Sequence, residues 1–289
     1  MASLIDVSRR LLRIQYSSLP NVADLPAGAT VVNSLFGPMV AFDGDLITSQ
    51  LIDFGAHTRN ELSMLLTFLD GGDLVYDLGA HIGTFAIPFA AAVGPGGQIV
   101  CVEPILAHFD LLLANIRARG LDNVTTIRAA VGNPDDTYCV RAKPENTGAS
   151  YLVRVSAGSS IPTETFGALH ARTNAGRRTA LIKVVVQGME ETVLRAAAPI
   201  IERDRPILYI QVVPEQLRRH DGSAAGIDSL LREHDYRFFR NVGARNSSND
   251  TFEIAELENV ADGGTFFDLL ALHANDAKLA RFGLQTGHH

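Results

Sequence analysis

The chain has no tryptophan and, among its 289 residues, only two cysteines, Cys101 and Cys139. Two cysteines outside a C-x-x-C pair cannot form a disulfide framework and do not support a thiolate zinc site, so we expect a reducing compartment. Positive charge is also scarce, because the formal net charge is −7. Phosphate recognition needs a clustered positive surface, and we therefore expect no nucleic acid as a partner.

Long apolar runs are missing as well. No segment reaches the roughly 18 uninterrupted apolar residues of a membrane span. The N-terminal stretch MASLIDVSRRLLRIQYSSLP lacks the basic-then-apolar order of a signal peptide. We expect a cytoplasmic protein that does not contact a membrane, and we interpret Gly287-His288-His289 as a possible tag remnant.

The two common phosphate-binding motifs, G-x-G-x-x-G and G-x-x-x-x-G-K-[ST], are absent, but a glycine turn is present in DLVYDLGAHIGTF. Asp77 closes an apolar strand, Gly79 and Gly83 lie in the turn, and a helix begins near Thr84. Glycine permits a tight turn and a close ligand, and a helix N-terminus supplies free N–H groups. His81 stands where the dinucleotide fingerprint has glycine, so we do not expect a pyrophosphate.

An acid follows at the end of the next strand, QIVCVEP, where Glu103 precedes Pro104. An acid at this strand tip can accept both hydroxyls of a ribose, and Asp77 suits a positive amino group. The glycines alone could form only a structural turn, and Glu103 alone could be a solvated strand end. Together, on neighbouring strand tips, they favour an amino-acid-bearing nucleoside without phosphates, which describes S-adenosylmethionine.

The order of elements indicates an α/β fold. From residue 71 onward, apolar strands and helices alternate at the spacing of parallel βαβ units, apart from a polar inserted segment at about residues 135–180. The last two strand candidates, YRFFRNV and TFFDLLALH, suit an antiparallel pair at the sheet edge. We predict an N-terminal cap over residues 1–70, with helices and a short hairpin turning near Gly37-Pro38, and a doubly wound domain over residues 71–289.

The succession of these motifs resembles the FkbM-type S-adenosylmethionine-dependent methyltransferases. VYDLGAHIGTF, VCVEP, TTIRAAVG, LIKVVVQGMEETVL and ILYIQ follow one another as that family's blocks do, over roughly residues 38–240. The resemblance implies the class I methyltransferase fold, a Rossmann-like, mainly parallel sheet of seven strands in the order 3-2-1-4-5-7-6 with strand 7 antiparallel. It also implies S-adenosylmethionine as cofactor and methylation of an oxygen of a small molecule or sugar.

The resemblance assigns cofactor contacts to particular positions. Residues of the glycine turn would surround the methionine moiety, Glu103 would take the ribose, and Ala129-Ala130 would lie against the adenine. His81 stands where the family commonly has Asn. The full set of implied cofactor residues is Asp77, Gly79, Ala80, His81, Gly83, Thr84, Glu103, Pro104 and Ala130.

The acceptor half departs from the family, whose fourth strand reads like I-K-x-D-x-E-G and whose fifth strand ends in Glu. Val185, Gln187 and Gln211 stand at these acidic positions. Amides can hydrogen-bond a polar substrate but carry no charge, so we assign Gln187 and Gln211 to substrate binding. We predict no metal ligand and a metal-independent reaction.

A hydroxyl acceptor must lose its proton, and four residues are candidates for handling it. Lys183, Glu190 and His81 are our catalytic candidates, and His57 is a candidate on the substrate side. Each has an ordinary structural alternative: a lysine paired with an acid, a carboxylate complementing a helix N-terminus, a histidine that only binds cofactor, and a surface-loop histidine.

A basic stretch could serve an anionic acceptor or simply form a solvated loop. Its residues are Arg141, Lys143, Arg154, Arg172, Arg177 and Arg178.

Three functions remain open from the sequence: the O-methyltransferase, an S-adenosylmethionine-binding protein with a regulatory or structural role that has lost transfer activity, and a binder of another nucleoside. The expected partner is a small-molecule acceptor. Oligomeric state is also open, with a homodimer among the possibilities.

Overall fold

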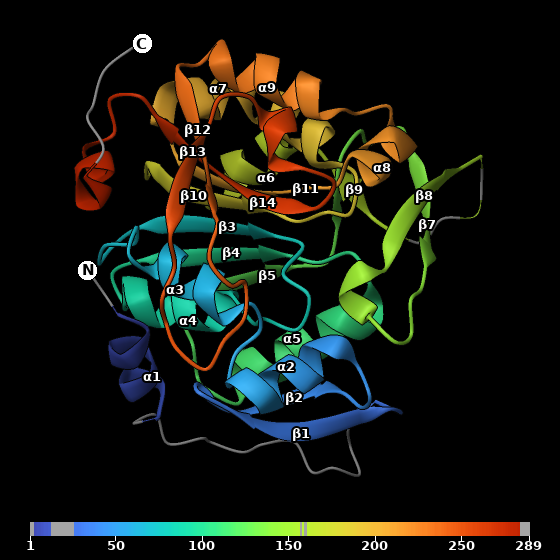
Figure 1. Ribbon diagram of the computed structural model, residues 1–289. Helices are drawn as coiled ribbons and strands as arrows, with labels where there is room; N and C mark the ends of the chain where they lie inside the picture. The colour runs from blue at the N-terminus through green and yellow to red at the C-terminus, as the bar shows by residue number, and fades with distance from the viewer. Residues whose placement is uncertain (1–2, 13–25, 157, 159–160, 284–289) are drawn as a thin grey trace.

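The computed structural model describes residues 3–12, 26–156, 158 and 161–283. At its centre is an eight-stranded sheet in the order β13-β12-β14-β11-β10-β3-β4-β5 (Figure 1). Its strands are β3 (Leu74–Leu78), β4 (Gln98–Val102), β5 (Val124–Ile127), β10 (Thr179–Val184), β11 (Ile207–Val212), β12 (Tyr236–Asn241), β13 (Ile254–Leu257) and β14 (Phe267–His273).

The strand order confirms the predicted fold. Across the sheet, the seven strands β5, β4, β3, β10, β11, β14 and β12 follow the class I order 3-2-1-4-5-7-6. β14 runs antiparallel to both β11 and β12. One strand was not predicted: β13 pairs antiparallel with β12 and forms the edge of the sheet. The antiparallel pair expected at the edge is therefore present, with a further strand outside it.

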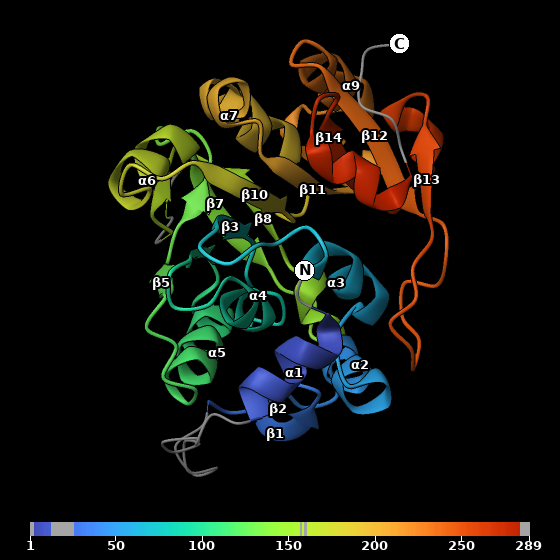
Figure 2. The ribbon, with the colours of Figure 1, turned by 90° about the vertical axis from the view of Figure 1, so that its left-hand side faces the viewer.

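Helices cover both faces of the sheet (Figure 2). One face carries α1 (Leu4–Leu12), α2 (Leu46–Phe54), α3 (Arg59–Leu66), α4 (Ala86–Val93) and α5 (Leu106–Arg117). The other carries α6 (Phe166–Thr173), α7 (Glu190–Asp204), α8 (Pro214–Leu217) and α9 (Ala224–Arg232). Four 3-10 turns are described: η2 (Thr147–Ala149), η3 (Arg218–His220), η4 (Val260–Gly263) and η5 (Ala277–Phe282).

Burial on both faces explains why the parallel strands are almost wholly apolar. In β3, Val75 belongs to the core under α1–α5, whereas Tyr76 and Leu78 belong to the core under α6–α9. The same alternation places Asp77, the acid of this strand, on the face of Val75. A charged residue inside such a strand needs a partner, which the neighbouring strand supplies.

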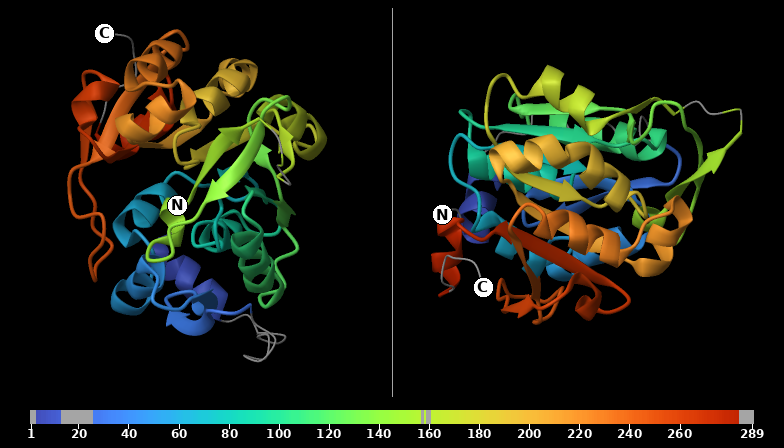
Figure 3. Two further views of the ribbon diagram at one scale, coloured as in Figure 1. Left: turned by 90° about the vertical axis from the view of Figure 1, so that its right-hand side faces the viewer. Right: turned by 90° about the horizontal axis from the view of Figure 1, so that it is seen from above.

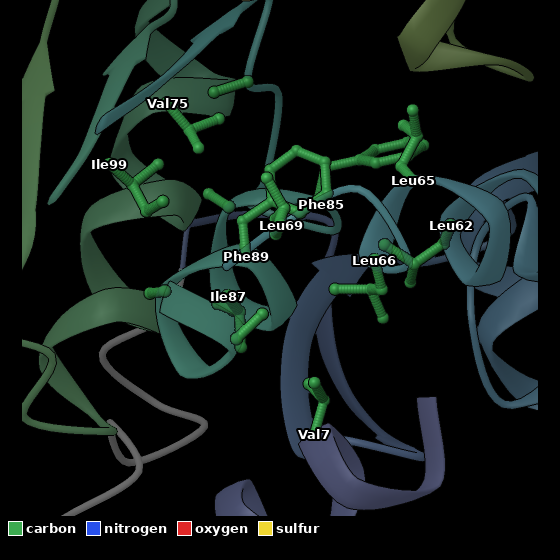
Figure 4. Close-up of a cluster of buried hydrophobic side chains, with 14 of the residues drawn as sticks. Val7, Leu62, Leu65, Leu66, Leu69, Val75, Phe85, Ile87, Phe89 and Ile99 are labelled. Atoms are coloured by element: carbon green, nitrogen blue, oxygen red, sulfur yellow. The ribbon is translucent and has the colours of Figure 1, made fainter. Parts of the chain in front are cut away.

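The N-terminal residues pack into the first of these cores. Val7 of α1 lies in one cluster with Leu66, Val75 and Ile99 (Figure 4). The predicted hairpin is present as β1 (Ala29–Ser34) and β2 (Gly37–Phe42), with its turn just before Gly37 rather than after it.

Two polar side chains of α5 hold that hairpin in place. Asn115 accepts a hydrogen bond from the N–H of Val40 and donates to the carbonyls of Val40 and Ile82. Arg119, fully buried, donates to the carbonyl of Pro38 at 2.6 Å. The hairpin is thereby fixed to the turn that follows β3.

The inserted segment contains more structure than its polar sequence indicates. It forms a hairpin of β7 (Thr137–Arg141) and β8 (Tyr151–Val155), which stands beside the sheet at the ends to which β3 and β4 point (Figures 1 and 3). The strand expected through TTIRAAVG is split, because β5 ends at Ile127 and β6 (Ala130–Val131) pairs with β9 (Thr163–Glu164) instead.

Candidate active site

A cavity lies at the carboxyl ends of the parallel strands, where α/β sheets place their ligands. Its wall is built from the turn after β3, the end of β4, residues 129–131, the turn and strand at residues 147–152, the ends of β10 and β11, and single residues from β14 and the loop before β13. All the predicted cofactor residues line it except Asp77 and Gly83. The hairpin β7–β8 thus closes the side that the sheet leaves open.

The turn after β3 requires glycine for a specific steric reason. Gly79 has φ +81°, and a Cβ there would lie 1.9 Å from the carbonyl oxygen of Val185. Gly83 has φ +92°, with the side chain of Leu112 3.0 Å from the position of a Cβ. The cofactor turn is therefore pressed against the end of β10, and only glycine permits this approach.

Glu103 lies at the tip of β4 with its carboxylate facing the cavity. It is 4% exposed, and its two oxygens accept hydrogen bonds from the N–H groups of His81 and Ile105, both at 2.9 Å. Each carboxylate oxygen has a further lone pair, so the pair of ribose hydroxyls predicted for this position can still be accepted. These donors hold the side chain in one orientation before a ligand arrives.

Asp77 and Lys183 form a buried ion pair beneath this turn. Lys183 Nζ donates to Asp77 Oδ1 at 2.8 Å and to the carbonyl of Gly79 at 3.2 Å, and it lies 5.1 Å from the centre of the Phe85 ring. Asp77 Oδ2 is buried and has no hydrogen-bond partner among the described residues. An ammonium held in this way donates protons, so a role for Lys183 as base requires the pair to break.

His81 is held by the inserted segment. Its backbone is left-handed, with φ +50°, and its Nε2 lies 3.0 Å from Thr147 Oγ1. Burial, followed by the nearby His108 and His57, lowers the pKa of His81 well below its usual value. The ring is therefore neutral at physiological pH, and its centre lies 4.2 Å from that of His108, with the two ring planes tilted by 60°.

His57 reaches the cavity from the loop before α3. Its Nδ1 lies 2.6 Å from Gln50 Oε1, an acceptor, which assigns the proton to Nδ1 and leaves Nε2 free to accept. Burial lowers the pKa of His57 to about 3, with Arg245 and Lys183 adding to the effect. His57 can thus accept a hydrogen bond but is a weak base.

Glu190 is not brought to the cavity. Its oxygens accept hydrogen bonds from the N–H groups of Val186, at 3.0 Å, and Gly188, at 2.8 Å. Burial raises the pKa of Glu190 to about 7 against the effect of these backbone bonds. The carboxylate caps the turn after β10, a structural role different from the predicted alternative of complementing the helix N-terminus.

Gln187 and Gln211 meet across the cavity wall. Gln187 Nε2 donates to Gln211 Oε1 at 3.0 Å, and both side chains line the cavity. Gln187 adopts φ +55°, so the turn directs this amide toward β11 at some conformational cost. The remaining oxygen of Gln187 and N–H of Gln211 are available to a polar ligand.

Sequence reasoning missed the charged residues at the far end of the cavity. Asp268 of β14, Arg245 and Tyr209 line it, and Glu61 of α3 lies behind, 3.5 Å from the Tyr209 hydroxyl. One signal was available: Asp268 is the one charged residue in the otherwise apolar start of the strand FDLLAL. The predicted strand order sets this strand beside the fifth, and so beside Gln211.

The comparisons with known proteins establish the family. The family model described as "Methyltransferase FkbM domain" matches residues 77–238, more than half of the chain. The chain belongs to the FkbM methyltransferase family. This confirms S-adenosylmethionine as the cofactor predicted from the glycine turn and Glu103.

Two solved methyltransferase structures are similar to this FkbM-family chain at low sequence identity. The FkbM methyltransferase of Methylobacillus flagellatus KT is 15% identical, with 70% of this chain and 43% of that one covered and a TM-score of 0.41. A precorrin-6y C5,15-methyltransferase from Geobacter metallireducens GS-15 is 13% identical, covering 75% and 87%, with a TM-score of 0.43. A search of curated proteins finds no match.

The basic stretch does not serve the acceptor end of this family member's cavity, contrary to one of the two interpretations of its sequence. None of its six residues lines the cavity. Arg154 pairs with Asp136 and Asp221, and Arg172 pairs with Glu164. Their charges are therefore neutralised on the outside of the inserted segment.

The described residues contain neither a cluster that could hold a metal ion nor a helix that could cross a membrane. In residues 3–12, 26–156, 158 and 161–283, no three or more His, Cys, Asp and Glu side chains are grouped so that they could hold a metal ion. No helix within those ranges combines the length and apolarity needed to cross a membrane.

Proposed function

We propose that this FkbM-family chain transfers the methyl group of S-adenosylmethionine to a hydroxyl oxygen of a small molecule or sugar, without a metal ion. The observation that carries the proposal is the continuity of one cavity from Glu103 on β4 to Gln211 on β11. The end of the cavity that binds the cofactor is thus continuous with the end lined by the uncharged amides of Gln187 and Gln211. The cytoplasmic location and a homodimer stay predictions.

The residues at the cofactor end fit S-adenosylmethionine by their chemistry. Glu103 offers acceptors for the ribose hydroxyls, whereas Asp77 lies beneath the turn and outside the cavity wall. When bound, S-adenosylmethionine supplies a methyl group on a positively charged sulfur. Lys183 holds Asp77 and the Gly79 carbonyl in place, which fixes the turn on which the cofactor rests.

The residues at the acceptor end position a hydroxyl and exclude water. Phe85 and Val185 present apolar surface, while Gln187 and Gln211 offer one free acceptor and one free donor group. Holding the acceptor oxygen in place lowers the activation free energy of the transfer, because the two reactants no longer have to meet by collision in the correct orientation.

Calorimetric titration with S-adenosylmethionine and S-adenosylhomocysteine tests the cofactor end. In Glu103→Ala we expect affinity to fall about 10–100-fold, because hydrogen bonds to a charged group contribute about 1.5–3 kcal/mol. The matched control is Glu202→Ala on the exposed side of α7, which should bind like wild type. Binding that is absent, or indifferent to Glu103, would refute the cofactor assignment.

Incubation with methyl-labelled cofactor and small molecules fractionated by size and charge tests the transfer. We expect label in an alcohol-containing fraction and its persistence in the presence of a chelator.

The alternative is a protein that binds the cofactor without transferring its methyl group. It is favoured by two observations: Gln187 and Gln211 hydrogen-bond each other, and Lys183 is held by Asp77. Cofactor binding with no label in any fraction would support it. The effect of Gln187→Glu then decides whether a lost acid is the cause, since activity should appear in that variant if it is.

A further inference from the structure

Asp268 occupies an unusual position at the acceptor end of the cavity. It pairs with Gln211 in the register of β14 and β11, so the two side chains lie on the same face of the sheet. The side chain is 7% exposed and lines the cavity. Its Oδ2 accepts a hydrogen bond from Arg245 Nε at 2.8 Å, whereas its Oδ1 is buried without a hydrogen-bond partner in the described part of the chain.

An ionised carboxylate oxygen can only accept, so a buried one without a donor is unfavourable in the free protein. A ligand that brings an O–H or N–H group to Oδ1 removes this penalty. The neighbouring N–H group of Gln211 is a side-chain donor on the same face, yet it does not bond to this oxygen.

We propose that Asp268 binds the acceptor hydroxyl through Oδ1 and takes its proton, so that the acid missing at Gln211 is supplied from the adjacent strand. This inference rests on the proposed function. In the step, the acceptor O–H proton moves to Asp268 Oδ1, the oxygen forms a bond to the methyl carbon, and the carbon–sulfur bond breaks with its electron pair left on sulfur. The products are the methyl ether, S-adenosylhomocysteine and a neutral Asp268, which returns its proton to solvent.

The neighbours of Asp268 fit this role. Arg245 holds Oδ2 and leaves Oδ1 as the oxygen without a donor, acting as a positioning residue. From β11, the Tyr209 hydroxyl faces both Asp268 and Glu61, and burial, with Asp268 next, raises its pKa well above the usual value, so it stays protonated. From α3, Glu61 lies close enough for Asp268 to raise its pKa.

The same neighbours define the charge of the acceptor. The positive charge of Arg245 is paired with Asp268, and Glu61 lies behind Tyr209. An anionic group near the reacting oxygen would meet an unpaired carboxylate oxygen rather than a free cation. The geometry therefore favours an uncharged alcohol, such as a neutral sugar or polyol.

The first experiment compares Asp268→Asn with Asp43→Asn, a control at an exposed acid outside the cavity. The Asn side chain keeps an oxygen for Arg245 but cannot take a proton. We expect transfer to fall about 10²–10⁴-fold in Asp268→Asn. Cofactor affinity should stay at the wild-type value, whereas the Tm of the ligand-free protein should fall somewhat, because the buried ion pair with Arg245 loses one charge. A loss of cofactor affinity would make Asp268 a structural residue and overturn the inference.

The second experiment moves the acid. Because Gln211 and Asp268 are register partners, the double variant Gln211→Glu with Asp268→Asn places a carboxylate one strand away and should recover part of the lost transfer. In Asp268→Ala, added formate should restore transfer that acetamide does not. Wild-type transfer in Asp268→Asn, or no recovery in both tests, would contradict the inference while leaving the proposed function intact.

A third readout does not depend on turnover. Saturation-transfer NMR on protein loaded with S-adenosylhomocysteine compares a panel of neutral methyl glycosides with the matching uronates. We expect wild type to bind neutral members more tightly than uronates, and Asp268→Asn to lose that binding. A preference for uronates, equal binding by the two proteins, or no binding by any probe would overturn the inference. Absence of methyl transfer to any fraction by wild type would instead count against the proposed function.

Discussion

Gly79 shows how one missing side chain decides the geometry of the cofactor turn. Its φ of +81° and the Val185 carbonyl, 1.9 Å from the position of a Cβ, leave no room for alanine. In Gly79→Ala we expect the free energy of unfolding to fall by at least about 3 kcal/mol and cofactor affinity to be lost, because the turn must separate from β10. Urea unfolding and calorimetric titration measure the two effects.

The control for this prediction is Gly44→Ala. Gly44 has a similar φ, +71°, but nothing lies within 4 Å of the position of a Cβ. Only the backbone strain of a left-handed alanine remains, about 1 kcal/mol, with cofactor affinity unchanged. Equal losses in the two variants would show that strain, and not the contact with Val185, makes Gly79 necessary.

The sequence predicted the roles of those single residues whose role depends on residues nearby in the sequence. Gly79 and Glu103 were recognisable because a strand, a turn and a helix follow one another locally. The pairing of Lys183 with Asp77, and of Gln211 with Asp268, depends on register between strands far apart in sequence. Such contacts follow from sheet order, which no single motif contains.

At the scale of elements, the inserted segment meets the residues that follow the N-terminal hairpin, and Thr147 links both to the cofactor turn. Thr147 donates its N–H to Asp45 Oδ1 at 2.6 Å, and its Oγ1 lies 3.0 Å from His81 Nε2. In Thr147→Val we expect S-adenosylhomocysteine to dissociate about 2–10-fold faster, because one hydrogen bond of about 0.5–1.5 kcal/mol is lost. Stopped-flow displacement measures this rate.

Thr137→Val is the matched control, since Thr137 Oγ1 donates to the carbonyl of Val155 at the other end of the same hairpin. It removes a comparable hydrogen bond without contacting His81. If both variants release the ligand equally fast, general loosening of the hairpin and not the contact at Thr147 controls release.

Glu61 links α3 to the strands and makes stability depend on pH. Burial, with Asp268 next, raises the pKa of Glu61 from 4.5 to about 7. The folded state then binds a proton that the unfolded state has released, so stability is full below pH 4.5 and falls as pH rises through 7. This group alone lowers the free energy of unfolding by about 3 kcal/mol over that window.

Urea unfolding between pH 4.5 and 8 checks this dependence. Glu61→Gln keeps the shape of the side chain but cannot ionise, so its stability should fall less steeply than that of wild type. Some slope remains, because burial also raises the pKa of Glu190 to about 7. Glu202→Gln, at an exposed position, should show the same pH dependence of stability as wild type. If the stability of Glu61→Gln also falls in parallel with that of wild type, Glu61 is not the group responsible.

Elements were predictable where hydrophobic periodicity was strong. The strands β3, β4, β10, β11 and β14 follow apolar runs, and the order of the sheet was implied by the family resemblance. The hairpin β7–β8 and α6 were not resolved, because their sequences are polar and only partly buried. The hairpin is held by packing at the cavity wall and α6 by packing against α7 and the sheet, and the local sequence pattern encodes neither contact.

For the whole molecule, the shared core predicts one cooperative unfolding transition. Leu11 of α1 is fully buried in the cluster that contains Val75 and Ile99, whereas its neighbour Leu12 is 57% exposed. Leu11→Ala should lower the single transition by about 2–5 kcal/mol, and Leu12→Ala by no more than about 0.5 kcal/mol. Circular dichroism and tyrosine fluorescence should give the same midpoint, since the chain has no tryptophan.

Separate transitions for the two probes, or equal effects of the two substitutions, would show that the N-terminal residues fold independently of the sheet.

The two cysteines lie in different environments, so their labelling rates can report how often the central strands separate. Cys101 lies beside Asp77 on β4 and is fully buried, and burial, with Asp77 adding to it, raises the pKa of its thiol. Cys139 is half-buried in the hairpin β7–β8. An alkylating reagent should therefore modify Cys139 in the closed protein and Cys101 only during excursions that part the strands. The ratio of the two labelling rates would report how often the floor of the cofactor site opens, and how far a bound ligand slows it.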